Sequence, residues 1–403
     1  MPERRCDITR AEDGTVRIAG PSAGPTFTRA VLEVAGAVLT WPVLGPTGPP
    51  AAEIHDVGQA QQWLWAVYGE RTAAAVDAVA SGTPAAELTL PEQPTALAEA
   101  AARLALGHWA SRWWPTSYLD GIPALEPNVL GLELAALTHE CQQLLDESGE
   151  VEGAELLEEH LAALDPLIRW LQSAAPPRQL DRVLRLIDDA ADNVGLDGEA
   201  LRRLGSALEQ DHRPTATPLD LTELFARQQE FALAAGSLGT ATDRRVIARG
   251  SGTNDWCRYP PGFVDAAEDA VSWTVYAVGA GRRIEVEVVA DIAAPVGGVH
   301  LAAEVHVDGS PPNRVPLARR DDVWTGRADL DIPASTTPSI EVGILLPGFD
   351  PGPGADDRAA REAVRALARH RLGVAAAPHD SEAAHPDPFL AEIAATAAVE
   401  EDF

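Results

Sequence analysis

Lysine is absent from the sequence, so all 31 basic residues are arginine. A P-loop needs a lysine on its phosphates, a protein kinase needs its strand lysine, and a PLP enzyme needs a lysine for the Schiff base. Lysine-based aldolases and Ser-Lys hydrolases depend on the same amine. The sequence therefore excludes these classes of enzyme.

Cysteine is also scarce, with three residues that lie far apart and in no CxxC pattern: Cys6, Cys141 and Cys257. This spacing predicts reduced thiols rather than a disulfide framework or a zinc site. No apolar run approaches the roughly 20 residues of a membrane span, and the N-terminal residues lack the apolar stretch of a signal peptide. We therefore expect a cytoplasmic protein without a membrane partner.

The excess of acidic residues gives a formal net charge of −30. Nucleic acids and anionic lipid surfaces are bound by basic surfaces, so neither is expected as a partner. The charge instead favours other proteins as partners, in particular proteins with basic surfaces.

The predicted fold combines α and β parts in several domains. Residues 1–50 read as an irregular or β segment. Residues 51–238 are expected to form a mostly α-helical bundle, because leucines recur at steps of three and four in stretches separated by short loops. Within this range, 59–80 is predicted as one helix, and 96–114 as another that ends before Pro115.

Near residue 240 the apolar period changes from that of a helix to that of a strand. Ile284, Val286 and Val288, for example, alternate with Glu285 and Glu287. Such alternation is typical of antiparallel sheets with one exposed face. Several strands of this kind in residues 239–350 predict an immunoglobulin-like or fibronectin-like β-sandwich.

The C-terminal part is predicted as one charged helix, 355–373, and a disordered acidic tail, 374–403. Within the tail, the segment FLAEIAATAAV begins at Phe389 and Leu390. We expect this segment to fold into a short helix only against a partner.

Potential metal ligands gather in three places, and none of them matches a metal motif. The pair His139–Glu140 lacks the second histidine of HExxH, because Gln143 stands at that position. An acidic stretch near 188–198 lacks the alternating ligands and closing glutamate of an EF-hand. No metal or cofactor is therefore predicted. The remaining residues of these groups are His379, Asp380, Glu382, His385 and Asp387 in the tail, and Asp188, Asp189, Asp192, Asp197 and Gly198.

Ser251 and Cys257 are the candidate nucleophiles, in the stretch RGSGTNDWCRYPPG at 249–262. Arg258 could lower the pKa of the Cys257 thiol, but no histidine is near in sequence to act as the base. The simpler interpretation is an interdomain linker whose Trp256 packs against the start of the sandwich.

Two further features of the sequence are candidate protein-binding surfaces. Glu155, Glu158 and Glu159 end an acidic run that either is a solvated helix start or binds a basic partner. In the stretch 105–125, Trp109 and Trp113 fall on one helical stripe and are expected in the core. Trp114 points about 100° away from Trp113 by helix geometry. Trp114 and Tyr118 are therefore candidate interface residues.

Because no catalytic group stands out, the sequence favours a non-enzymatic cytoplasmic scaffold or adaptor that mediates protein–protein interactions within a multi-component bacterial system. Two alternatives stay open. One is a hydrolase with a Cys257 or Ser251 nucleophile near the domain junction. The other is a small-molecule sensor that uses the helical domain, with Trp114 and Tyr118 lining a pocket. The candidate interface residues are Trp114, Tyr118, Glu155, Glu158, Glu159, Phe389 and Leu390.

Overall fold

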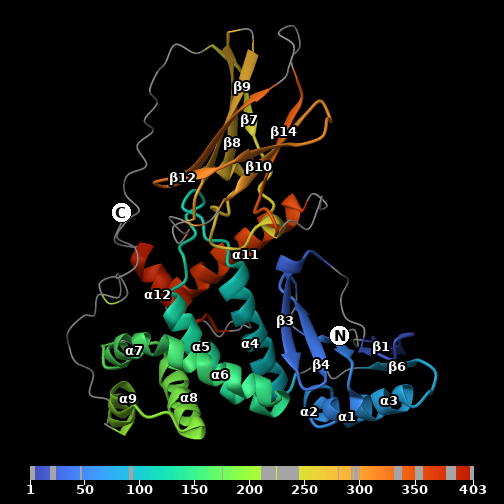
Figure 1. Cartoon of the computed structure of the whole chain (residues 1–403). Coiled ribbons are helices and arrows are strands. Elements are labelled where there is room, and N and C mark those ends of the chain that lie inside the picture. Colours follow the sequence, from blue (N-terminus) through green and yellow to red (C-terminus); the bar gives the residue numbers. More distant parts are fainter. Residues whose placement is uncertain are drawn as a thin grey trace. The chain divides into compact units, whose positions relative to one another are not determined.

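The computed structural model (Figure 1) contains both helices and antiparallel sheets. The chain divides into two compact units. Unit 1 comprises Met1–Trp114, Leu125–Phe225 and Arg369–Phe403, and unit 2 comprises Pro115–Ala124 and Ala226–Ala368. The structure describes residues 5–18, 24–45, 48–89, 94–174, 176–209, 224, 245–279, 281–291, 294, 298, 300–330, 338–349, 357–377 and 387–399.

Unit 1 begins with a six-stranded antiparallel sheet of order β3-β4-β5-β2-β1-β6. The apolar stretch 30–41, which fits strand or helix equally well in sequence, forms a hairpin that turns at Gly36 with φ 76°. The short strands β5 and β6 lie in the range expected to be helical, so that expectation is corrected there. The strands are β1 (Arg5–Arg10), β2 (Val16–Ile18), β3 (Arg29–Val34), β4 (Ala37–Pro42), β5 (Ala51–Ile54) and β6 (Ala86–Thr89).

The single helix predicted over 59–80 is three helices in the structure: α1 (Val57–Ala60), α2 (Leu64–Tyr68) and α3 (Glu70–Ala80). Gly69, with φ 86° and ψ 159°, separates α2 from α3, because this conformation cannot continue a helix and is open to glycine. Helix α3 packs against β1, β2 and β6 and buries Val76 and Val79 there. These helices therefore belong with the sheet.

Helix α4 begins after Thr95, whose side chain caps Ala98 N–H, and ends before Pro115 as predicted. Helix α5 is the central helix of unit 1, because every residue from Val129 to Thr138 is buried and α4, α6 and α8 all pack against it. The green and cyan ribbons of Figure 1 show this arrangement. The helices are α4 (Ala96–Trp113), α5 (Pro127–Glu140), α6 (Glu147–His160), α7 (Leu164–Leu171), α8 (Arg178–Val194) and α9 (Glu199–Glu209).

Unit 2 contains two antiparallel sheets, of orders β12-β13-β9-β8-β7 and β11-β10-β14. The predicted alternation is confirmed in β9, where Ile284, Val286 and Val288 are fully buried. The strands are β7 (Val246–Ser251), β8 (Val271–Val278), β9 (Gly281–Val289), β10 (Ala302–Val307), β11 (Asn313–Pro316), β12 (Ala318–Arg320), β13 (Val323–Leu330) and β14 (Ile340–Leu345).

The C-terminal part contains α11 (Arg358–Ala376), within which the boundary between the units falls, and α12 (Leu390–Val399). The prediction of a disordered tail is wrong for residues 387–399. Phe389 and Leu390 are almost completely buried in unit 1, where α12 packs against α5. The prediction failed because it followed the acidic composition of the whole tail, in which this apolar stretch is short. Among the described helices, none is long and apolar enough to cross a membrane.

Candidate interaction site

A short loop follows α4 and belongs to unit 2. Trp114 caps α4, with its N–H donating to Ala110 O at 3.1 Å, and Pro115 ends the helix. Ser117 and Ile122 then exchange two backbone hydrogen bonds, of 2.9 and 2.8 Å, across a tight turn. The loop Pro115–Ala124 is therefore a small hairpin, referred to below as the 115–124 loop.

The carboxylate of Asp265 holds the 115–124 loop in place. Its Oδ1 accepts a hydrogen bond from Ser117 Oγ at 2.7 Å, and its Oδ2 accepts one from the backbone N–H of Tyr118 at 2.7 Å. Oδ1 also accepts from Ala267 N–H at 2.9 Å, and Asp265 is only 2% exposed. Hydrogen bonds from uncharged donors to a buried carboxylate are among the stronger ones in proteins. The loop conformation is therefore fixed by the fold of unit 2.

A second contact ties the 115–124 loop to α11. Arg365 reaches Asp120 at 3.1 Å and Glu268 at 3.3 Å, and Arg361 lies 2.6 Å from the same glutamate. Burial alone would raise the pKa of Glu268. The hydrogen bond and charge of Arg361, together with Arg365, outweigh burial and hold the pKa below its usual value. Arg365, held by the ionised Glu268, therefore joins α11 to the loop through Asp120.

The tip of the 115–124 loop presents apolar side chains to solvent. Tyr118 is 72% exposed and Leu119 is 46% exposed. Exposed large apolar side chains are ordinary when they are scattered singly. Here two adjacent ones stand on a loop whose backbone is fixed from below. The arrangement can bind another surface without first losing loop entropy.

Of the two tryptophans expected in the core, Trp109 is buried, whereas Trp113 is only partly buried because it lies at the last position of α4. Trp109 is buried, and its Nε1–H donates to Phe27 O at 2.7 Å. The Trp113 ring packs against the Phe27 ring with centroids 6.2 Å apart. Trp114 is partly exposed. Among these aromatic residues, Tyr118 is by far the most accessible for a partner.

The acidic candidates lie on α6. Glu155, Glu158 and Glu159 are all exposed, and so is Glu152 one turn earlier. Val151 stands beside them, 58% exposed. The helix thus offers a solvated negative surface on unit 1, whereas Tyr118 belongs to unit 2.

The remaining candidates, Phe389 and Leu390, are placed inside unit 1 and not on its surface. The Phe389 ring lies beneath the guanidinium of Arg103, 4.9 Å from the ring centroid, and near that of Arg371, at 5.3 Å. The two residues are therefore unavailable to a partner while α12 stays in this position.

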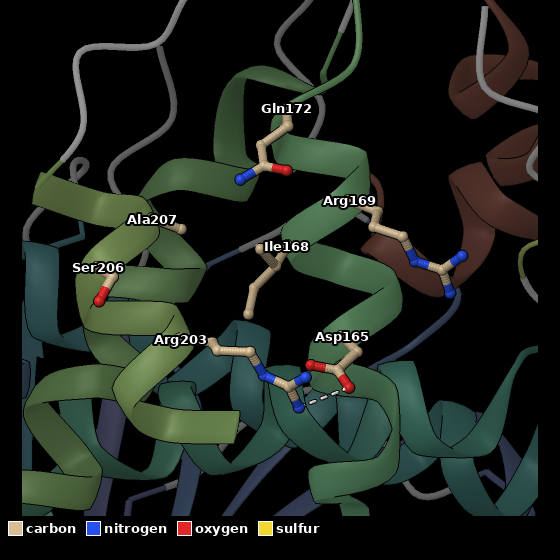
Figure 2. Close-up of a pocket in the computed structure, with 7 residues that line it drawn as sticks. All are labelled: Asp165, Ile168, Arg169, Gln172, Arg203, Ser206 and Ala207. Carbon is tan, nitrogen blue, oxygen red and sulfur yellow. Dashed lines mark hydrogen bonds and ion pairs between the residues drawn. The ribbon is translucent and has the colours of Figure 1, made fainter. Parts of the chain in front are cut away.

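A surface groove of about 530 Å³ lies between α7 and α9, as Figure 2 shows. Its lining includes the apolar Ile168 and Ala207 and the basic Arg169 and Arg203. Arg203 is paired with Asp165 at 2.8 Å. A groove of this kind suits a small molecule with an anionic group. Trp114 and Tyr118 do not line it.

The candidate nucleophile Cys257 lies in a turn of 3-10 helix, Trp256–Arg258, and is partly buried. Its backbone N–H donates to Asp255 at 3.0 Å. Arg258, which might have activated the thiol, is paired with Glu304 at 2.7 Å. The positive charge expected to stabilise a thiolate is therefore offset. Ser251 lies at the end of edge strand β7 and is exposed.

Within the part of the chain that the structure describes, no three His, Cys, Asp or Glu side chains are placed to hold a metal ion. Of the tail residues, His379, Asp380, Glu382 and His385 lie outside the described residues. In the comparisons with known proteins, no family model, no curated protein and no solved structure matches the chain.

Sequence reasoning overlooked the buried carboxylates that organise these surfaces. Glu133 is fully buried in α5 and Asp265 is nearly so in unit 2. Glu133 had a signal, because it interrupts an apolar run between Leu132 and Leu134. Asp265 sits between Val264 and Ala266 and had a weaker signal of the same kind.

Proposed function

We propose that this protein is a cytoplasmic scaffold or adaptor that binds other proteins without catalysing a reaction. The observation that carries the proposal is the exposed Tyr118–Leu119 pair on a loop fixed by the buried Asp265. Tyrosine is enriched at the energetic centres of protein interfaces, and fixed loops lose little entropy on binding. The 115–124 loop is the proposed contact of unit 2.

The acidic face of α6 is the proposed contact of unit 1. Its exposed carboxylates, together with the net charge of −30, attract a protein with a basic surface. Such attraction mainly raises the association rate and weakens with added salt. Binding through α6 should therefore depend on ionic strength, whereas binding through Tyr118 should depend on it much less.

We further propose that unit 2 is an immunoglobulin-like sandwich and that α4–α9 form a helical bundle, as expected from the sequence. Immunoglobulin domains place strands A, B, E and D in one sheet and C and F in the other. The orders β8-β9-β13-β12 and β11-β10-β14 match A-B-E-D and C′-C-F. This correspondence supports the sandwich, with β7 added beside the position of strand A.

The test compares partner recovery by the full chain and two variants. The wild type, Tyr118→Ala and the control Val278→Ala, which is exposed on β8 of the same unit, are used as bait in native cytosol. We expect a set of proteins that the wild type and the Val278→Ala variant recover and the Tyr118→Ala variant loses. Identical recovery with all three would refute the role of the 115–124 loop.

A small-molecule sensor is the second candidate, favoured by the groove between α7 and α9. Arg203 is paired with Asp165, and Arg169 is the other arginine that lines the groove. A panel of small carboxylates and phosphates is screened for an increase in Tm, first on the wild type and then on Arg169→Ala. A Tm increase that Arg169→Ala abolishes would support the sensor, and no increase across the panel would count against it.

A further inference from the structure

The last described segment of the chain, residues 387–399, is held in unit 1 like a bound peptide. Its backbone is contacted by side chains from three different helices. Arg103 of α4 donates to Asp387 O at 2.7 Å, and Gln179 of α8 donates to Pro388 O at 3.0 Å. Glu133 of α5 accepts from Leu390 N–H at 2.7 Å. The surface that makes these contacts is called the α5 groove below.

A buried ion pair fixes the first turn of the segment. Arg371 of α11 binds both carboxylate oxygens of Glu392, at 2.6 and 2.7 Å. Glu392 is fully buried, and its Oε2 also accepts from Phe389 N–H at 2.7 Å. A buried ion pair of this geometry is costly to break, because the remaining partner stays charged and unpaired.

The apolar side chains complete the match. Phe389 fills the space between Arg103 and Arg371, and Leu390, Ala391, Ala394 and Ala395 are buried along one side of α12. Gly107 on α4 lies close to the Phe389 ring, where a larger residue would come into contact with it. Backbone recognition, one aromatic pocket and one charged anchor are the usual components of a peptide-binding groove.

A sequence that contains proline joins the segment to the helix before it. Residues 378–386 join α11 to the segment, and the chain carries prolines at Pro378, Pro386 and Pro388. Proline prevents α11 and α12 from forming one continuous helix. A linker of this length spans about 30 Å when extended. The contacts of the α5 groove would be the same whichever chain supplied the segment.

We propose that the α5 groove is an interaction site for a second copy of this chain, and that two copies exchange residues 387–399. A second copy carries the one sequence that satisfies all of these anchors at once. Exchange of an identical element is a low-cost route to a dimer, because no new interface must be built. Two strongly acidic chains repel each other, so added salt favours the exchanged dimer.

Two charge-reversed variants of the full chain test the exchange. In Glu392→Arg the segment faces Arg371 with a like charge, and in Arg371→Glu the groove faces Glu392 with a like charge. Each variant alone is expected to have a lower Tm than the wild type. In an equimolar mixture, exchange brings the Glu392 of one variant to the Arg371 of the other, and the two substituted residues to each other. Opposite charges then meet in both grooves, which happens only by exchange. We expect the mixture to form a heterodimer by size-exclusion chromatography with light scattering and to regain Tm. A mixture that stays monomeric, with two unchanged transitions, overturns the proposal.

A second measurement covers the case in which the charge-reversed variants do not fold. A labelled peptide of residues 386–399 is added to the full chain carrying Phe389→Ala, whose own segment binds poorly. We expect saturable binding and a Tm that rises with peptide concentration. The same peptide with Glu392→Arg should bind on the order of 100-fold more weakly.

Exchange between wild-type copies is measured separately, with copies that carry two different fluorophores. If the peptide binds but these copies do not exchange, the second copy is not the occupant, and a foreign segment of the same chemistry is. No peptide binding would overturn the groove itself. Neither result affects the proposed role of Tyr118, which lies in the other unit.

Discussion

Asp265 accepts a hydrogen bond from the backbone N–H of Tyr118 at 2.7 Å, across 147 residues of sequence. This contact links the buried interior of unit 2 to Tyr118, the most exposed aromatic side chain among the described residues of that unit. The contact fixes the backbone beneath the exposed Tyr118 ring.

Replacing Asp265 by alanine should lower the free energy of unfolding by about 3 kcal/mol, because the buried donors of Ser117 and Ala267 lose their acceptor. Urea unfolding followed by tryptophan fluorescence measures the change. The control is Asp329→Ala on β13. It removes an exposed carboxylate that is paired with Arg283 of β9, and it should leave the urea midpoint nearly unchanged. Equal midpoints for both variants would contradict the structural role of Asp265.

His108 should make the protein less stable in mild acid. Burial lowers the pKa of this imidazole below its ordinary value of 6.5, and the nearby charge of Glu152 offsets part of the effect. Between the folded-state pKa and 6.5, the unfolded chain binds more protons than the folded chain. The free energy of unfolding therefore rises with pH through this window and falls as the pH drops below about 6.5.

The measurement for His108 is the urea midpoint from pH 5 to pH 8. His108→Gln should flatten the acid side of the profile, whereas His55→Gln, at an exposed position, should leave the profile as it is in the wild type. A wild-type slope in the His108→Gln variant would show that other groups cause the loss.

Two glycine substitutions should act in opposite directions. A methyl group at Gly131 on α5 would overlap the imidazole of His160, which packs directly on the helix backbone. Gly131→Ala should therefore destabilise the protein by about 1–3 kcal/mol. Gly373 lies in α11 with open space around it, so Gly373→Ala should stabilise the helix by up to about 1 kcal/mol. Thermal unfolding of the two variants distinguishes the outcomes, and a stable Gly131→Ala would contradict the close packing.

The three cysteines should differ in reactivity towards a thiol reagent in the native state. Cys6 and Cys141 are buried, and burial, with the nearby charge of Glu140, raises the pKa of Cys141 to about 12. Cys257 is partly exposed and should be modified first, at the rate of an ordinary thiol, while the other two react after unfolding. A Cys257 rate far above that of free cysteine would revive the hydrolase alternative.

Local signals were enough for several elements of the fold. Pro115 marks the end of α4, and the alternation of apolar and charged residues identifies β9. The two breaks within 57–80 were missed, because Gly69 is tolerated in a helical pattern and only its left-handed backbone shows that a helix ends there. The strands β5 and β6 were missed because each is short and pairs with residues far away.

The candidate interface residues also include some that the sequence could predict and some that it could not. Tyr118 follows a helix end in a polar loop, and this position alone suggested an interface. Phe389 and Leu390 were assigned to a partner interface, because the surrounding composition is acidic and rich in alanine and proline. Their burial in unit 1 depends on Arg103, Glu133 and Arg371, which lie on other helices.

The sequence by itself determined which enzyme chemistries are excluded, because folding cannot supply the missing lysine amine. It also determined the helices and strands whose signals lie within a few residues. Only the tertiary structure decided which carboxylates are buried and what they hold. Asp265 reaches Tyr118 across 147 residues, and Glu133 reaches Leu390 across 257. Burial is favourable for such a charge only when its distant partners are in place, and that condition has no local signature in the sequence.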